Sequence, residues 1–217
     1  MHSVRAVLFD LDGTLADTAA DLGYVLNLQR TARGLDQLPL DRVRPVVSQG
    51  ARGLLRIGFG LTPEQDDYRA MRDEFFELYA ANLMRQTRLF DGMDELLEEL
   101  ETRGLAWGIV TNKLARFTEP LVTALGLVHR AGCVISGDTC ARPKPHPDPL
   151  LEAARRLGAE PCACLYVGDD ERDVQASRAA GMKSVVALYG YLGENAQPAA
   201  WNADVTIERP LDVLEIV

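Results

Sequence analysis

The stretch Ala6–Leu15, AVLFDLDGTL, decides the fold. Four apolar residues, Ala6–Phe9, lack polar alternation and predict a strand buried on both faces. Asp10 and Asp12 follow directly, and Gly13 allows the chain to turn sharply away. Polar residues at the carboxyl end of a buried strand lie where α/β sheets place their active sites. An uncompensated charge there is costly, so the pair favours chemistry over the alternative of solvated turn residues.

Further apolar runs and helical patterns alternate along the rest of the chain. The expected strands are Ala106–Thr111, Cys133–Ser136, Cys164–Val167, Ser184–Ala187 and a short final one at Val205–Ile207. The expected helices between them are Gly92–Arg103, Pro147–Leu157 and Arg172–Ala180, with a loop at Asn195–Ala203. This alternation predicts an α/β fold with a doubly wound, Rossmann-like parallel sheet.

One segment breaks the alternation, because residues 17–88 show helical periodicity and no convincing strand. Its expected helices are Ala19–Arg33, Arg52–Phe59 and Asp66–Met84. We therefore predict a catalytic core made of residues 1–16 and 89–217. Residues 17–88 would form a small all-helical cap inserted after the first strand, with hinges at Ala16–Thr18 and Thr87–Gly92.

Two more motifs place phosphate-binding groups near expected strand ends. In VTNK, Val110–Lys113, Thr111 offers a hydroxyl and Asn112 an amide to a phosphoryl group. In RPKPHP, Arg142–Pro147, two prolines stiffen the backbone around Lys144, whose fixed ammonium suits a phosphate or a cluster of carboxylates. The alternatives are a helix-capping threonine and an ordinary surface lysine.

The motif VGDDERD, Val167–Asp173, follows the expected strand Cys164–Val167. Asp169, Asp170 and Asp173 make an oxygen-rich cluster of the kind that Mg²⁺ prefers. An acidic helix N-terminus is the alternative for this motif taken alone. The order of the four motifs, all at or past strand ends, favours one site at one edge of the sheet.

Composition limits the possible partners. The chain has 217 residues and a net charge of −9, which argues against nucleic acid as a partner. Its four cysteines form no CxxC pair and no zinc pattern, its start does not resemble a signal peptide, and no window is apolar enough to span a bilayer. We expect a cytoplasmic protein, a monomer or weak homodimer, whose partner is a small phosphorylated metabolite.

Taken together, the four motifs resemble those of the haloacid dehalogenase superfamily, and the resemblance covers essentially the whole chain. It implies that Asp10 is the nucleophile and Asp12 the general acid/base, and that Thr111 and Lys144 orient and neutralise the phosphoryl group. It also implies Mg²⁺ held by Asp169, Asp10 and the Asp12 carbonyl, with Asp170 and Asp173 in support. The helical insert resembles the family's small cap. Dehalogenases of this superfamily lack the second aspartate, so Asp12 points to phosphate esters.

Within the superfamily the chain most resembles bacterial phosphoglycolate phosphatases and also the N-acetylmuramic acid 6-phosphate phosphatases of pseudomonads. The likeness is carried by LFDGMDELLEEL, WGIVTNKLARFTEPL, VGDDERDVQASRAAGM and ALYGY. It implies Mg²⁺-dependent hydrolysis of a small sugar or sugar-acid phosphate through an aspartyl-phosphate. The alternatives are a phosphosugar mutase, which would depend on a bisphosphate activator, and a non-catalytic binding protein on this fold.

Specificity is expected from the cap, and VSQGARGLL, Val47–Leu55, is the best candidate. Gly50 and Arg52 lie where a loop is expected to enter a helix, flanked by Ser48 and Gln49. We predict that Arg52 meets a substrate carboxylate. An exposed helix arginine is the alternative.

Overall fold

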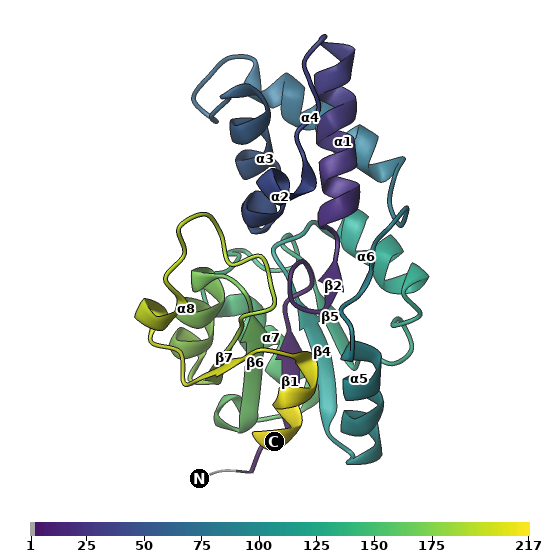
Figure 1. The fold of residues 1–217 in the computed structure, drawn as a ribbon. Coiled ribbons are helices and arrows are strands. Elements are labelled where there is room, and N and C mark those ends of the chain that lie inside the picture. The colour runs from purple at the N-terminus through teal and green to yellow at the C-terminus, as the bar shows by residue number, and fades with distance from the viewer. Residues whose placement is uncertain (1–2) are drawn as a thin grey trace.

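The computed structural model describes residues 3–217, and a six-stranded parallel sheet forms its centre (Figure 1). The strand order is β5-β4-β1-β6-β7-β8. The strands are β1 Ala6–Phe9, β4 Ala106–Val110, β5 Cys133–Ile135, β6 Cys164–Gly168, β7 Lys183–Ala187 and β8 Val205–Ile207. All six lie within one residue of the predicted strands, which confirms the doubly wound α/β fold.

Strand β1 lies in the middle of the sheet, between β4 and β6. Phe9 pairs with Ile109 on one side and with Val167 on the other, and every residue of β1 is buried. The backbone N–H of Asp10 still donates to the Val167 carbonyl at 2.9 Å. The sheet therefore fixes the backbone at which the Asp10 side chain leaves the strand.

Helices cover both faces of the sheet, because alternate strand residues point to opposite sides. Val7 and Phe9 join a core with α5 (Met93–Thr102) and α6 (Ala115–Ala124). Ala6 and Leu8 join a second core that includes residues of α7 (Asp148–Leu157) and α8 (Glu171–Ala180).

The insert after β1 is helical, as predicted, and Figure 1 shows it gathered at one end of the sheet. Its helices are α1 Ala19–Ala32, α2 Leu40–Val43, α3 Gly50–Phe59 and α4 Tyr68–Ala80. The two connections to the sheet pair as short antiparallel strands, β2 Ala16–Asp17 and β3 Arg88–Leu89. They fall inside the two segments predicted as hinges. The division into a core and a cap that moves as a unit stays a prediction.

Several short elements of one or two turns do not appear among the predicted ones. They are α2 and the 3-10 turns Arg44–Gln49, Pro161–Ala163, Pro198–Trp201 and Pro210–Glu215. The turn Pro198–Trp201 lies in a segment expected to be only loop. Such short elements contain too few residues to display a helical period. No helix among residues 3–217 combines the length and apolar character needed to cross a bilayer.

A buried carboxylate ties α1 to the segment that leads back from the insert. Asp21 is fully buried, and its carboxylate accepts hydrogen bonds from the backbone N–H groups of Arg85, Gln86 and Thr87 at 2.8–3.1 Å. The Thr87 hydroxyl donates a further bond at 2.7 Å. The Asp21 carboxylate is therefore stabilised by four hydrogen-bond donors rather than by a counter-ion.

Asp21→Ala should lower the free energy of unfolding by about 3 kcal/mol, because it leaves buried backbone donors without partners. Asp66→Ala, at an exposed aspartate of the same insert, is the matched control and should cost less than about 0.5 kcal/mol. Urea denaturation of both variants measures the difference. A loss at Asp21 no larger than at Asp66 would contradict this account.

Candidate active site

A cavity of about 250 Å³ opens where the helical insert faces the carboxyl ends of the strands. The sheet contributes polar lining residues, namely Asp10, Asp12, Thr111, Asn112, Lys113, Lys144, Asp170, Arg172 and Asp173. The insert contributes mostly apolar ones, namely Leu22, Val47, Ser48, Gln49, Gly50, Ala51, Phe75, Phe76 and Tyr79. Most of the residues predicted from the four motifs therefore meet at one cavity.

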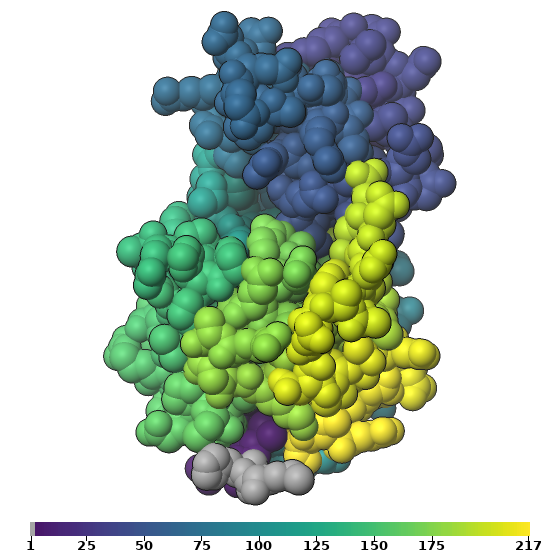
Figure 2. Space-filling model, turned by 90° about the vertical axis from the view of Figure 1, so that its left-hand side faces the viewer, coloured from purple at the N-terminus to yellow at the C-terminus, as the bar shows by residue number. Residues whose placement is uncertain are grey.

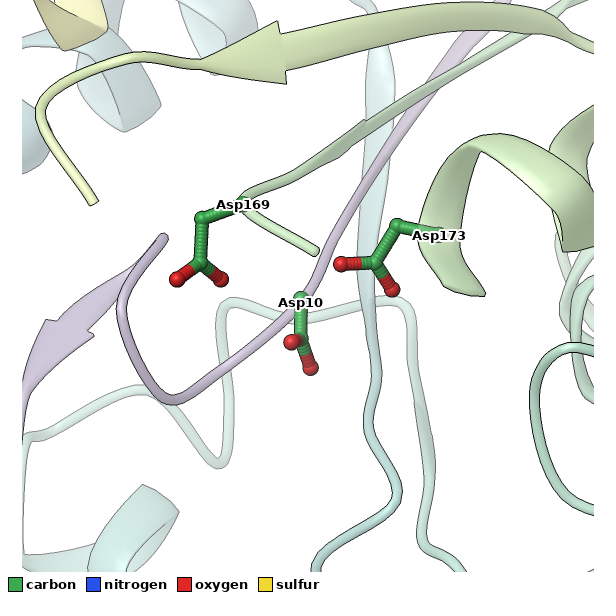
Figure 3. Close-up of side chains that lie close together, drawn as sticks. All are labelled: Asp10, Asp169 and Asp173. Carbon is green, nitrogen blue, oxygen red and sulfur yellow. The ribbon is translucent and has the colours of Figure 1, made fainter. Parts of the chain in front are cut away.

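Three buried carboxylates converge at the base of the site. Asp10 follows β1, Asp169 follows β6, and Asp173 belongs to the first turn of α8. One oxygen of each lies within 4.8 Å of the others, and Figure 3 shows the three side chains facing a common space. Gly13 makes this packing possible, because its φ is +87° and a side chain there would clash with Asp169.

Burial and crowding raise the pKa values of two carboxyl groups in this cluster, Asp10 and Asp169. Burial, together with the charges of Asp173 and Asp12, raises the pKa of Asp10 to about 6 although Lys144 opposes the shift. Burial and the charges of Asp10 and Asp173 raise the pKa of Asp169 well above its usual value. Clustered, partly uncompensated carboxylates fit a hard divalent cation such as Mg²⁺. The predicted metal set thus meets in space through Asp10 and Asp169.

Lys144 reaches the same cluster, and every N–H donor of its ammonium has an acceptor. Its ammonium lies 2.7 Å from Asp173 Oδ1 and 3.0 Å from Asp10 Oδ1. It also donates to the Tyr166 hydroxyl at 2.7 Å and to the Val110 carbonyl at 3.1 Å. Thr111, predicted with it, is buried beside it and lines the cavity.

Asn112 holds the Lys144 loop in place. Its side-chain amide donates to the Lys144 carbonyl at 2.9 Å, and its side-chain oxygen accepts from the Lys144 N–H at 3.0 Å. Both polar atoms predicted to face the substrate are thus engaged with the loop. The substrate-binding role of Asn112 stays a prediction.

The Asp12 side chain is not part of the three-carboxylate cluster. Its Oδ1 accepts hydrogen bonds from the Thr18 hydroxyl at 2.5 Å and from Lys113 Nζ at 2.8 Å. The side chain of Asp12 is therefore not among the candidate metal ligands. The resemblance implies the backbone carbonyl of Asp12, and not its side chain, as a ligand of Mg²⁺. Lys113 received no role in the sequence analysis, although it closes the VTNK motif.

Two polar contacts join the insert to the acidic motif. The Ser48 hydroxyl donates to Asp169 Oδ2 at 3.1 Å, and Arg172 Nη2 donates to the Ser48 carbonyl at 2.6 Å. Arg172 also pairs with Asp170, which keeps the pKa of that carboxyl below its usual value despite burial. Gly50 begins α3 and lines the cavity, whereas Arg52 is exposed and does not line it. The predicted carboxylate contact of Arg52 has no support in this geometry.

Tyr191 connects the first hinge to the acidic cluster. Its backbone N–H donates to Asp169 Oδ2 at 2.8 Å, and its hydroxyl accepts from the N–H of Thr18 at 2.7 Å. The segment after β7 that carries Tyr191 rises along the molecule to meet the insert (Figure 2). At its top, Glu194 pairs with Arg56 at 3.1 Å. In the sequence Tyr191 stands at the end of the ALYGY stretch, and these contacts were not predicted from it.

Residues 7–187 match the model of the haloacid dehalogenase-like hydrolases. The chain belongs to this family. It is 46% identical over 215 residues to a phosphoglycolate phosphatase of Xanthomonas campestris, which covers 99% of this chain and 97% of the relative. It is 41% identical over 214 residues to the N-acetylmuramic acid 6-phosphate phosphatase of Pseudomonas aeruginosa, with 99% and 95% covered.

A solved structure has the same fold over its whole length. It is described as a predicted phosphoglycolate phosphatase from Haemophilus somnus, with a TM-score of 0.87, 29% identity, and coverage of 100% of this chain and 99% of the other. The family and these full-length relatives indicate that the chain is a phosphatase.

Asp169→Asn should raise the melting temperature of metal-free protein by about 3 °C, because it removes one of the crowded charges. An asparagine amide can keep all three hydrogen bonds, because its oxygen can accept from the Ser48 hydroxyl and the Tyr191 N–H while its NH₂ group donates to the Thr14 hydroxyl. The same variant should lose the stabilisation that added Mg²⁺ gives the unmodified protein.

Thermal unfolding with and without Mg²⁺ measures both effects. Glu171→Gln, at an exposed acidic residue beside the cluster, is the control and should keep the Mg²⁺ response. An Asp169→Asn protein that Mg²⁺ still stabilises would remove Asp169 from the metal site.

Proposed function

We propose that the chain is a Mg²⁺-dependent phosphatase for a small sugar or sugar-acid phosphate, of the phosphoglycolate or N-acetylmuramic acid 6-phosphate type. The observation that carries the proposal is the position of Asp10. Its carboxylate lines the cavity beside Lys144 and the acidic cluster, and Asp12 supplies a second carboxylate from the same turn. The names of the full-length relatives support the substrate class. Cytoplasmic location, a monomer or weak homodimer and the lack of a nucleic-acid partner stay predictions.

In the first step, Asp10 attacks phosphorus and the bond from phosphorus to the ester oxygen breaks. Asp12 gives the leaving oxygen a proton, so an alcohol departs and an aspartyl-phosphate remains. Asp12 then takes a proton from water, which attacks phosphorus and releases phosphate and free Asp10. Each residue thus returns to its starting state.

The surrounding residues keep the phosphoryl group and Asp10 in line. Lys144 lies 3.0 Å from Asp10 Oδ1, where it can offset charge on both partners, and Asn112 holds its loop. Asp10, Asp169 and the Asp12 carbonyl would hold Mg²⁺, with Asp170 and Asp173 in support. Bound Mg²⁺ would neutralise charge on the phosphoryl oxygens. The insert, as a cap, would exclude bulk water.

Phosphate release from a panel of phosphate esters tests the proposed function. The panel contains 2-phosphoglycolate, N-acetylmuramic acid 6-phosphate, hexose phosphates and nucleotides, each with Mg²⁺ or with a chelator. We expect release from one of the two acidic substrates, its loss with chelator, and a fall of at least about 10⁴-fold in Asp10→Asn. Release that persists in Asp10→Asn would exclude Asp10 as the nucleophile.

Asp12→Asn tests the two roles of Asp12 with p-nitrophenyl phosphate. The p-nitrophenolate leaves without a proton, so Asp10 should still be phosphorylated, whereas attack by water lacks its base. Stopped-flow measurement should therefore show a burst near one equivalent of p-nitrophenol followed by slow turnover. Asp10→Asn should give no burst, and equal single-phase kinetics in Asp12→Asn and unmodified protein would argue against the assignment.

A further inference from the structure

Lys113 and Tyr79 lie together on the wall of the cavity and do not belong to the three-carboxylate cluster. We propose that these two side chains form a second anion site, which binds a carboxylate on the organic part of the substrate. This inference rests on the proposed function, because it concerns the part of the same substrate that is not the phosphoryl group. It also replaces Arg52 as the residue that meets that carboxylate.

Among the described residues three cations line the cavity, namely Lys113, Lys144 and Arg172, and Lys144 is fully engaged. Lys144 contacts two carboxylates, a hydroxyl and a carbonyl. Arg172 forms a two-point pair with Asp170 and also donates to the Ser48 carbonyl. Lys113 has one hydrogen-bond acceptor among the described residues, Asp12, and an ammonium carries three donors. Lys113 thus keeps two donors for a ligand, whereas three hydrogen bonds hold Arg172 on Asp170 and Ser48.

The Lys113 ammonium is well placed to bind an anion strongly. Its side chain is 8% exposed, and its nitrogen lies 4.7 Å from the centre of the Tyr79 ring. The Asp12 carboxylate, 2.8 Å from the nitrogen, favours the charged form of the side chain. Charge pairs in such a poorly solvated site are stronger than at the surface.

Tyr79 supplies the second, independent observation. It is 2% exposed and lines the cavity, and its hydroxyl has no hydrogen-bond partner among residues 3–217. Burial raises its pKa to about 12, so the hydroxyl keeps its proton and can donate it. A buried hydroxyl without a partner is costly unless a ligand completes it. A carboxylate can accept from Tyr79 and Lys113 together.

The rest of this wall is apolar. Phe75, Phe76 and Phe117 pack around Tyr79, with the Tyr79 and Phe117 ring centres 5.2 Å apart. Such a wall offers few other polar groups to the organic part of a substrate. It would leave Lys113 and Tyr79 to separate acidic substrates from neutral ones.

The shared contact with Asp12 links recognition to chemistry. In this structure Lys113 holds the Asp12 carboxylate at 2.8 Å. A substrate carboxylate would compete for the same ammonium and leave Asp12 freer to turn towards the leaving oxygen. Substrates without a carboxylate would lack this effect, so both their binding and their turnover should be poorer.

Matched substrate pairs test the proposal. One pair is 2-phosphoglycolate and 2-hydroxyethyl phosphate; the other is N-acetylmuramic acid 6-phosphate and N-acetylglucosamine 6-phosphate. In each pair only the first compound carries the carboxylate. In one of the two pairs, unmodified protein should hydrolyse the acid with a kcat/KM about 30-fold higher than that of its neutral partner. The pair that shows this ratio identifies which carboxylate the site binds.

Lys113→Met should reduce this ratio of kcat/KM values to about three or less. Lys113→Arg should keep most of the ratio, because the positive charge remains. Tyr79→Phe keeps the aromatic ring, removes the hydroxyl and should lower the ratio by about fivefold. This variant tests the proposal even if Lys113→Met does not fold. Lys183→Met, at an exposed lysine that starts β7, is the matched control and should keep the full ratio.

The outcomes separate this inference from the proposed function. If unmodified protein hydrolyses these esters without preference for the acids, the inference fails and the phosphatase remains. The same holds if folded Lys113→Met and Tyr79→Phe both keep the full ratio. If unmodified protein releases phosphate from none of the four esters, the proposed function is wrong, and the inference that rests on it is wrong as well.

Discussion

The repulsion among buried carboxylates at the end of β1 and β6 is the constraint on which the site depends. Asp10, Asp169 and Asp173 lie within 4.8 Å of one another, and burial makes their charges expensive. Lys144 compensates only two of them, at 2.7 and 3.0 Å. The remaining negative charge favours a bound cation. Proteins commonly accept such a loss of stability where a site must bind and react.

The sheet and the acidic motifs could be predicted because their signals are local. A buried parallel strand shows as an unbroken apolar run, so β1 matches its predicted range without change. Parallel strands end at one edge, so Asp10 and Asp169 had to approach each other. Lys144 was recognised because its loop is stiffened by prolines on both sides.

The far side of the cavity could not be predicted in the same way. Tyr79 lies on α4 at a helical spacing that indicates only burial, and nothing in the sequence shows that its hydroxyl lacks a partner. Lys113 follows Asn112 directly, but only tertiary contact reveals that it reaches Asp12. Arg52 was chosen by its glycine-flanked loop, and one turn of α3 directs it to solvent instead. Contacts between distant segments decide each case.

Residues of the insert form hydrogen bonds with the same carboxylates that are proposed to act in the reaction. Ser48 donates to Asp169, and Tyr191 contacts both Asp169 and the Thr18 backbone at the hinge. Thr18 in turn donates to Asp12, which Lys113 also holds. A displacement of the insert would therefore change the partners of Asp12 and Asp169 together. The hydrogen bonds that position the acid/base and a candidate metal ligand thus depend on the placement of the insert, which ties substrate recognition on its wall to the reacting groups on the sheet.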